Sequence, residues 1–219
     1  TLFSVLLFYR REIGALIRGV LGRGEEPAGQ RLLLFHLVLG TLPAAVVGLL
    51  FQDPIEAAFS TPAFAAVALL VTGTVLWSSR GFKAAAGSAG EGRSLDARMA
   101  LLIGLAQAVA IAPGISRSGM TIVAGLALGL SGERSAAFSF LLSIPAILGA
   151  VVLKAPELLE NGAGSLGPLE LSFGVLVSFG VGFLALGMLI WLIRRQKLSA
   201  FAPYCWLVGA LGLLGVLVA

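Results

Sequence analysis

Apolar runs close to the thickness of a lipid bilayer alternate with short polar segments along most of the chain. Such runs cover residues 32–51, 63–77, 136–153, 171–193 and 204–219, and a longer apolar stretch covers residues 99–130. A helix needs about 20 apolar residues to cross the hydrocarbon core of a bilayer. The pattern therefore predicts an all-α fold, a polytopic integral membrane helix bundle in which residues 1–219 form a single transmembrane domain.

Charged residues between the runs mark two sides of the membrane. Basic clusters lie at 10–31, 80–98 and 194–197, whereas carboxylates gather near residues 53 and 157. Lysine and arginine are enriched on the cytoplasmic side of membrane proteins. The run 63–77 ends on the basic side and the run 136–153 starts there, so the stretch 99–130 must enter and leave on the same side. We therefore expect a re-entrant hairpin of two half-length helices over about 95–130.

The residues that break helices lie at the midpoint of this expected hairpin. Residues 112–121 read Ala-Pro-Gly-Ile-Ser-Arg-Ser-Gly-Met-Thr, with Pro113 and Gly114 at the start and Gly119 near the end. Irregular backbone at membrane depth is tolerated only where it is buried in protein or lines an aqueous cavity. The turn is therefore expected to lie inside the protein or beside such a cavity.

Composition and charge exclude several other classes of protein. The chain is 58% hydrophobic and 12% charged, with a mean hydropathy of +1.00, whereas soluble domains are about 45–50% apolar and about 25% charged. We interpret the net charge of +4 as a marker of topology and expect no nucleic-acid partner. Cys205 is the single cysteine, so the chain holds neither an internal disulfide nor a cysteine-based zinc site.

Arg117 is the one charged residue of the hairpin turn. Placing an arginine near the bilayer centre costs about 3 kcal/mol on insertion scales and more than about 10 kcal/mol in simulations of isolated helices. Its planar guanidinium suits bidentate contact with phosphate or carboxylate. An anionic ligand would offset the cost. A structural partner, either a carboxylate or a set of carbonyl groups, is the alternative that stays open here.

Neighbouring residues favour the anion. Ser116, Ser118 and Thr121 supply hydroxyl groups, and Gly114 and Gly119 allow the backbone to approach a ligand because they lack a Cβ atom. The second half-helix begins here, so its unpaired N–H groups and positive dipole end point to the same place. A phosphate group is the simplest anion that uses all these donors together.

Gln107 lies six residues before Pro113, in the first half-helix of the hairpin. A buried amide needs a hydrogen-bond partner. That partner is either a second hairpin or the substrate, and the sequence favours neither.

Several blocks of the sequence resemble one family. These are Gln107, Pro-Gly-Ile-Ser-Arg-Ser-Gly-Met-Thr at 113–121, Ala-Phe-Ser-Phe-Leu-Leu-Ser-Ile-Pro at 137–145 and, less specifically, Thr-Leu-Pro-Ala-Ala-Val-Val-Gly at 41–48. Together they are similar to the undecaprenyl-diphosphate phosphatase family of the bacitracin-resistance type, over essentially the whole chain.

The resemblance implies an integral membrane hydrolase that converts undecaprenyl diphosphate to undecaprenyl phosphate and inorganic phosphate, which recycles the lipid carrier of cell-wall synthesis. It implies Arg117, Ser116 and Ser118 as catalytic residues. The substrate-binding residues would be Pro113, Gly114, Ser116, Arg117, Ser118, Gly119, Thr121 and Gln107.

The resemblance also implies the surroundings of the enzyme. These are a bacterial cytoplasmic (inner) membrane, a polyprenyl diphosphate as substrate, membrane lipids as neighbours, a divalent metal ion (Mg²⁺ or Ca²⁺) and inverted-repeat halves with one re-entrant hairpin each. A homodimer stays open.

The sequence departs from the family pattern at both ends. The first hairpin of the family, with a Glu-x-x-x-Glu pair and a Pro-Val-Ser-Ser-x-Gly-His stretch, would precede Thr1, so we expect the metal ligands outside these residues and no activity of this fragment alone. Tyr204 is followed by Cys205, where the family tends to have arginine.

A polyprenyl-phosphate flippase or an anion transporter is the alternative function. Inverted halves with broken helices and an anion site at the membrane midplane are also typical of secondary carriers. A carboxylate pair and release of inorganic phosphate would distinguish the hydrolase.

Overall fold

The computed structural model describes residues 2–23, 26–82, 92–161 and 167–218, and in these ranges the chain forms helices and no strand. The elements in chain order are α1 (Leu2–Phe8), α2 (Arg10–Val20), α3 (Pro27–Leu50), α4 (Gln52–Phe59), α5 (Pro62–Ser78), α6 (Ala97–Val109), α7 (Arg117–Ala127), α8 (Gly132–Asn161), α9 (Pro168–Arg194), the short 3₁₀ helix η1 (Leu198–Phe201) and α10 (Ala202–Val218).

Long apolar helices confirm the prediction of a polytopic membrane helix bundle. Among the described residues, α3, α8, α9 and the segment Leu198–Val218 are each long and apolar enough to cross a membrane. Helix α5 has 17 residues and joins α4 at an angle of 96°. These helices coincide with the runs predicted at 32–51, 63–77, 136–153, 171–193 and 204–219. The protein is therefore a multi-pass membrane protein.

The stretch 99–130 forms two short helices rather than one span. Helix α6 has 13 residues and α7 has 11, so at 1.5 Å per residue each covers about 16–20 Å, little more than half of a hydrocarbon core of about 30 Å. The two ends of the pair meet, because Arg93 N donates a hydrogen bond to Gly129 O (3.0 Å). This geometry agrees with the hairpin predicted for about 95–130. An inverted repeat and a single domain stay predictions.

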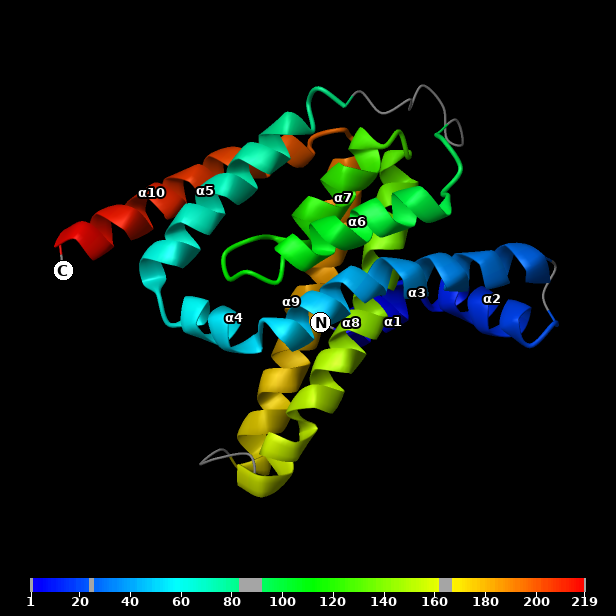
Figure 1. The fold of residues 1–219 in the computed structure, drawn as a ribbon, viewed down its shortest axis with the longest axis horizontal. Helices are drawn as coiled ribbons and strands as arrows, with labels where there is room; N and C mark the ends of the chain where they lie inside the picture. The colour runs from blue at the N-terminus through cyan, green and yellow to red at the C-terminus, as the bar shows by residue number, and fades with distance from the viewer. Residues whose placement is uncertain (1, 24–25, 83–91, 162–166, 219) are drawn as a thin grey trace.

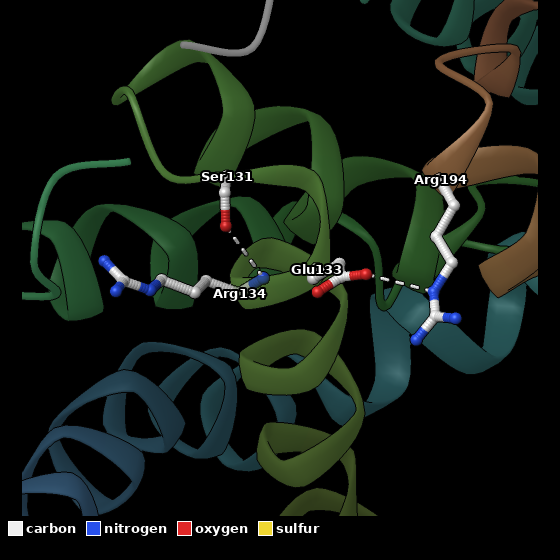
Figure 2. A network of polar contacts seen from close by, with 4 residues as sticks. All are labelled: Ser131, Glu133, Arg134 and Arg194. Atoms are coloured by element: carbon white, nitrogen blue, oxygen red, sulfur yellow. Dashed lines mark hydrogen bonds and ion pairs between the residues drawn. The ribbon is translucent and has the colours of Figure 1, made fainter. Parts of the chain in front are cut away.

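Polar contacts close the mouth of this hairpin (Figure 2). The Arg134 guanidinium donates hydrogen bonds to the carbonyl oxygens of Gly92 (2.9 Å) and Arg93 (3.2 Å), and its backbone N–H donates to Ser131 Oγ (3.3 Å). Next to it, Glu133 forms an ion pair of 3.0 Å with Arg194 at the end of α9. The mouth of the hairpin and the basic end of α9 therefore lie on one side of the protein.

Glycines allow the helices around the hairpin to pack closely. A Cβ atom on Gly104 of α6 would lie 2.3 Å from the carbonyl oxygen of Gly40 in α3. Helices α5 and α10 run side by side (Figure 1), and a Cβ atom on Gly73 of α5 would lie 2.6 Å from Trp206 Cδ1 of α10. The hairpin thus lies between α3 on one flank and the α5–α10 pair on the other.

The elements α2, α4 and η1 were not predicted. The polar stretch near residues 10–31 contains α2, the residues that end the run at 51 begin α4, and η1 directly precedes α10. All three are short helices beside the predicted spans, and no residue of α4 is buried.

Candidate functional site

The turn between α6 and α7 rests on α5. Gly114 has a φ of +86°, a backbone conformation that L-residues adopt only at a cost. A Cβ atom here would lie 2.4 Å from the carbonyl oxygen of Ala65 and 2.9 Å from Ala68 Cβ, both in α5. Gly114 therefore allows the turn to approach a helix. The expectation that it also lets the backbone approach a ligand stays a prediction.

Ser116 begins the second half-helix. It is the N-cap of α7, and its side-chain Oγ accepts a hydrogen bond from Gly119 N (3.1 Å). A Cβ atom on Gly119 would lie 3.0 Å from this Oγ and 3.2 Å from Leu76 Cδ2 of α5. The lack of a side chain at Gly119 thus serves the cap and the contact with α5, and the predicted approach to a ligand stays a prediction for this glycine too.

The start of α7 retains two backbone N–H groups that can bind an anion. The first four N–H groups of a helix have no partner within the helix. Gly119 N donates to the Ser116 side chain and Met120 N to the Ser116 carbonyl oxygen (2.9 Å). The N–H groups of Arg117 and Ser118 have no such partner within the first turn. The geometry is that of an anion site at a helix N-terminus.

Arg117 is the first residue of α7 and is half-buried. Within the described ranges, no ion pair or hydrogen bond engages its guanidinium. The nearest acidic residues in sequence serve other groups, since Asp96 caps α6 through Met99 N (2.8 Å) and Glu133 pairs with Arg194. No carboxylate in the described part of the chain is therefore found as a structural partner of Arg117.

The other two predicted hydroxyls differ in access. Ser118 is half-buried in the first turn of α7. Thr121 is 1% exposed; its hydroxyl donates to Arg117 O (2.9 Å) and lies 2.5 Å from the hydroxyl of Ser139 in α8. Thr121 therefore joins α7 to α8 in this structure, and its predicted role in substrate binding stays a prediction.

Gln107 lies inside the protein on α6, with 1% of its surface exposed. Neither its Oε1 nor its Nε2 atom has a hydrogen-bond partner among the described residues. Buried polar side chains are rarely left unpaired, so this amide is able to receive a further group. Both alternatives for its partner, a second hairpin or the substrate, stay open.

Sequence reasoning missed Thr72 of α5. Its hydroxyl donates to Gly114 O (3.0 Å) and accepts from Ser116 N (3.1 Å). Thr72 lies in the apolar run 63–77 and more than 40 residues from the turn, so no local motif links the two. The available signal was a pair of hydroxyls, Thr72 and Thr74, in an apolar run.

The donors at the turn suit an anion rather than a metal cation. They are a guanidinium, hydroxyls and backbone N–H groups. Among the described residues, no group of three or more histidine, cysteine, aspartate or glutamate side chains could hold a metal ion. The divalent ion implied by the resemblance stays a prediction, and its ligands are not found in these residues.

Donors that suit an anion thus gather at the interrupted helix pair α6–α7, within a polytopic membrane helix bundle. The chain belongs to the family of the bacitracin resistance protein BacA, whose model matches residues 1–211. The resemblance seen in the turn is thereby confirmed over nearly the whole chain.

Curated relatives of the chain carry the name undecaprenyl-diphosphatase. A protein from Acidiphilium cryptum is 40% identical over 221 residues, which cover 98% of this chain and 78% of the relative. One from Desulforapulum autotrophicum is 38% identical over 234 residues, 100% of this chain and 82% of the relative. One from Methanothermobacter thermautotrophicus is 42% identical over 183 residues, 83% of this chain and 99% of the relative.

Proposed function

We propose that the protein is a membrane-bound hydrolase that converts undecaprenyl diphosphate to undecaprenyl phosphate and inorganic phosphate. Membership of the BacA family and the name shared by its relatives support the reaction. The observation that links the reaction to a site concerns Arg117, the first residue of the short helix α7. Its guanidinium is half-buried and has no partner among the described residues.

The turn binds the diphosphate while the polyprenyl chain lies in the bilayer. Arg117 contacts phosphate oxygens with two N–H groups of its guanidinium, and the backbone N–H groups of Arg117 and Ser118 contact them from the helix N-terminus. The Ser118 hydroxyl is a further donor. Transfer of a phosphoryl group requires positioning and neutralisation of charge on its oxygens, and these residues supply both.

A divalent metal ion, Mg²⁺ or Ca²⁺, is part of the proposal. When bound, it would neutralise further charge on the diphosphate. The donors of the turn suit an anion, so they would contact the diphosphate rather than the metal ion.

The proposed place of the reaction is the bacterial cytoplasmic membrane, where the recycled carrier serves cell-wall synthesis. Its partners are the polyprenyl diphosphate and the surrounding lipids. Apolar side chains on α9 support contact with lipid, since Phe173, Leu176 and Leu184 are 70%, 68% and 74% exposed. A second copy of the chain is an alternative occupant of such a face, and a homodimer stays a prediction.

The test is release of inorganic phosphate from undecaprenyl diphosphate by purified protein, expressed with any residues that precede Thr1 in its gene. We expect multiple turnovers in detergent and in vesicles. Movement of the lipid between leaflets without phosphate release would contradict the proposal and favour a flippase. Binding of the lipid with neither outcome would contradict both.

A further inference from the structure

The hydroxyl of Thr72 on α5 bridges the two ends of the segment that precedes Arg117. It donates a hydrogen bond to the carbonyl oxygen of Gly114 (3.0 Å) and accepts one from the backbone N–H of Ser116 (3.1 Å). Thr72 is 3% exposed, whereas Gly114 and Ser116 are half-buried. Buried backbone groups outside regular structure need such partners, and this side chain supplies one to each.

Thr72 differs in this respect from the other threonines that the structure describes. The hydroxyls of Thr41, Thr61, Thr74 and Thr121 each donate to the carbonyl oxygen four residues earlier in the chain. This is an ordinary bond for threonine in a helix. The hydroxyl of Thr72 instead bonds to residues 42 and 44 positions away. Both hydrogen bonds of Thr72 go to the turn, and neither is the bond within its own helix that the other four threonines make.

The bond to Ser116 fixes the point at which α7 begins. Ser116 is held through its N–H by Thr72, and its own Oγ receives Gly119 N to cap the helix. Arg117 follows directly as the first residue of α7. The position of Arg117 therefore depends on α5 through the Thr72 hydroxyl, in addition to the packing of Gly114 and Gly119 against that helix.

We propose that Thr72 is a positioning residue of the phosphatase, because its hydroxyl sets the place of Arg117 and of the N–H groups at the start of α7. The proposal rests on the proposed function for its kinetic consequence, whereas the hold of Thr72 on the turn can be measured without substrate. A misplacement of about 1 Å in a catalytic group is enough to reduce a rate about 100-fold.

Thr72→Val removes the hydroxyl at nearly constant volume, and Thr72→Ser keeps it. For phosphate release from undecaprenyl diphosphate, we expect Thr72→Val to lower kcat about 10-fold to 100-fold. KM changes less, since burial of the polyprenyl chain supplies much of the ground-state binding. We expect Thr72→Ser to stay within about threefold of the wild-type rate, because both hydrogen bonds remain.

Thr74→Val is the matched control on the same helix. The Thr74 hydroxyl donates to Leu70 O (2.9 Å) and receives Trp206 Nε1 (3.3 Å), with no link to the turn. We expect this variant to retain the wild-type kcat. If Thr72→Val fails to fold, Thr72→Cys replaces it, because its thiol differs from the serine hydroxyl of Thr72→Ser mainly in hydrogen-bonding strength.

Amide hydrogen exchange of residues 110–119 measures the hold of Thr72 independently of activity. Exchange is expected to be faster in Thr72→Val and close to wild type in Thr72→Ser. If the wild type releases no phosphate but exchange behaves in this way, the proposed function fails and the hold of Thr72 stands. A wild-type kcat in Thr72→Val, or equal losses in Thr72→Val and Thr72→Ser, would overturn the proposal.

Discussion

Gly114→Ala tests whether α5 supports the turn. The new Cβ atom would lie 2.4 Å from the carbonyl oxygen of Ala65 and 2.9 Å from Ala68 Cβ. The φ of +86° costs an L-residue about 1–2 kcal/mol, and overpacking of a buried contact costs about 1–3 kcal/mol. The expected loss in the free energy of unfolding is therefore about 2–5 kcal/mol.

The closer of the two contacts is with a backbone atom, so removing the Ala68 side chain is expected to restore little of the lost stability. Ala68→Gly in the same protein removes the 2.9 Å contact but leaves the carbonyl oxygen of Ala65 at 2.4 Å. We expect at most a partial recovery in the double variant. Phosphate release should fall in parallel, because any shift of the turn moves Arg117 away from its place.

The assay is denaturant unfolding of the purified protein in detergent, together with the rate of phosphate release. Gly149→Ala is the matched control, because Gly149 lies in α8 and a Cβ atom there meets nothing within 4 Å. We expect this control to be neutral or more stable by up to about 1 kcal/mol, as alanine favours helix over glycine. Wild-type stability and activity in Gly114→Ala would refute the packing argument.

Two further substitutions test contacts of the N-terminal part of α8. Thr121→Val should lower the free energy of unfolding by about 1–3 kcal/mol, because it leaves the Ser139 hydroxyl buried without this partner. Adding Ser139→Ala should recover part of the loss. A larger loss in the double variant would contradict a hydrogen bond between the two hydroxyls. Glu133→Gln should change the unfolding free energy by less than about 1 kcal/mol, because its pair with Arg194 has side chains 58% and 66% exposed; a larger change in the same unfolding assay would show that the pair matters more than exposed pairs usually do.

Much of the fold follows from hydrophobic pattern alone. Runs of apolar residues located the spans because a bilayer accepts little else. The hairpin followed from charge on the connecting segments, since 99–130 had to return to the basic side. The structure places Arg93 against Gly129 at its mouth. Helices α2 and α4 escaped the pattern because they are short and carry charges along their lengths.

The candidate site was less predictable than the fold, because its support comes from residues distant in sequence. Arg117 could be singled out since one charge in an apolar hairpin needs a reason. The partners of Gly114 and Ser116 could not, because they are Ala65 and Thr72 in a separate span. The sequence motif indicated which residues are candidates for binding, whereas the structure was needed to show that Gly114 contacts α5 and Thr121 contacts α8.

Substitution of Arg117 tests whether its guanidinium binds the diphosphate. Phosphate release from undecaprenyl diphosphate is measured for Arg117→Ala and Arg117→Lys, with Arg98→Lys as control, because Arg98 is exposed near the start of α6. We expect a loss of at least about 100-fold in Arg117→Ala. Arg117→Lys should recover little, since a lysine keeps the charge but not the bidentate donors. A rate near wild type in folded Arg117→Lys or Arg117→Ala would show that the reaction does not depend on the Arg117 guanidinium.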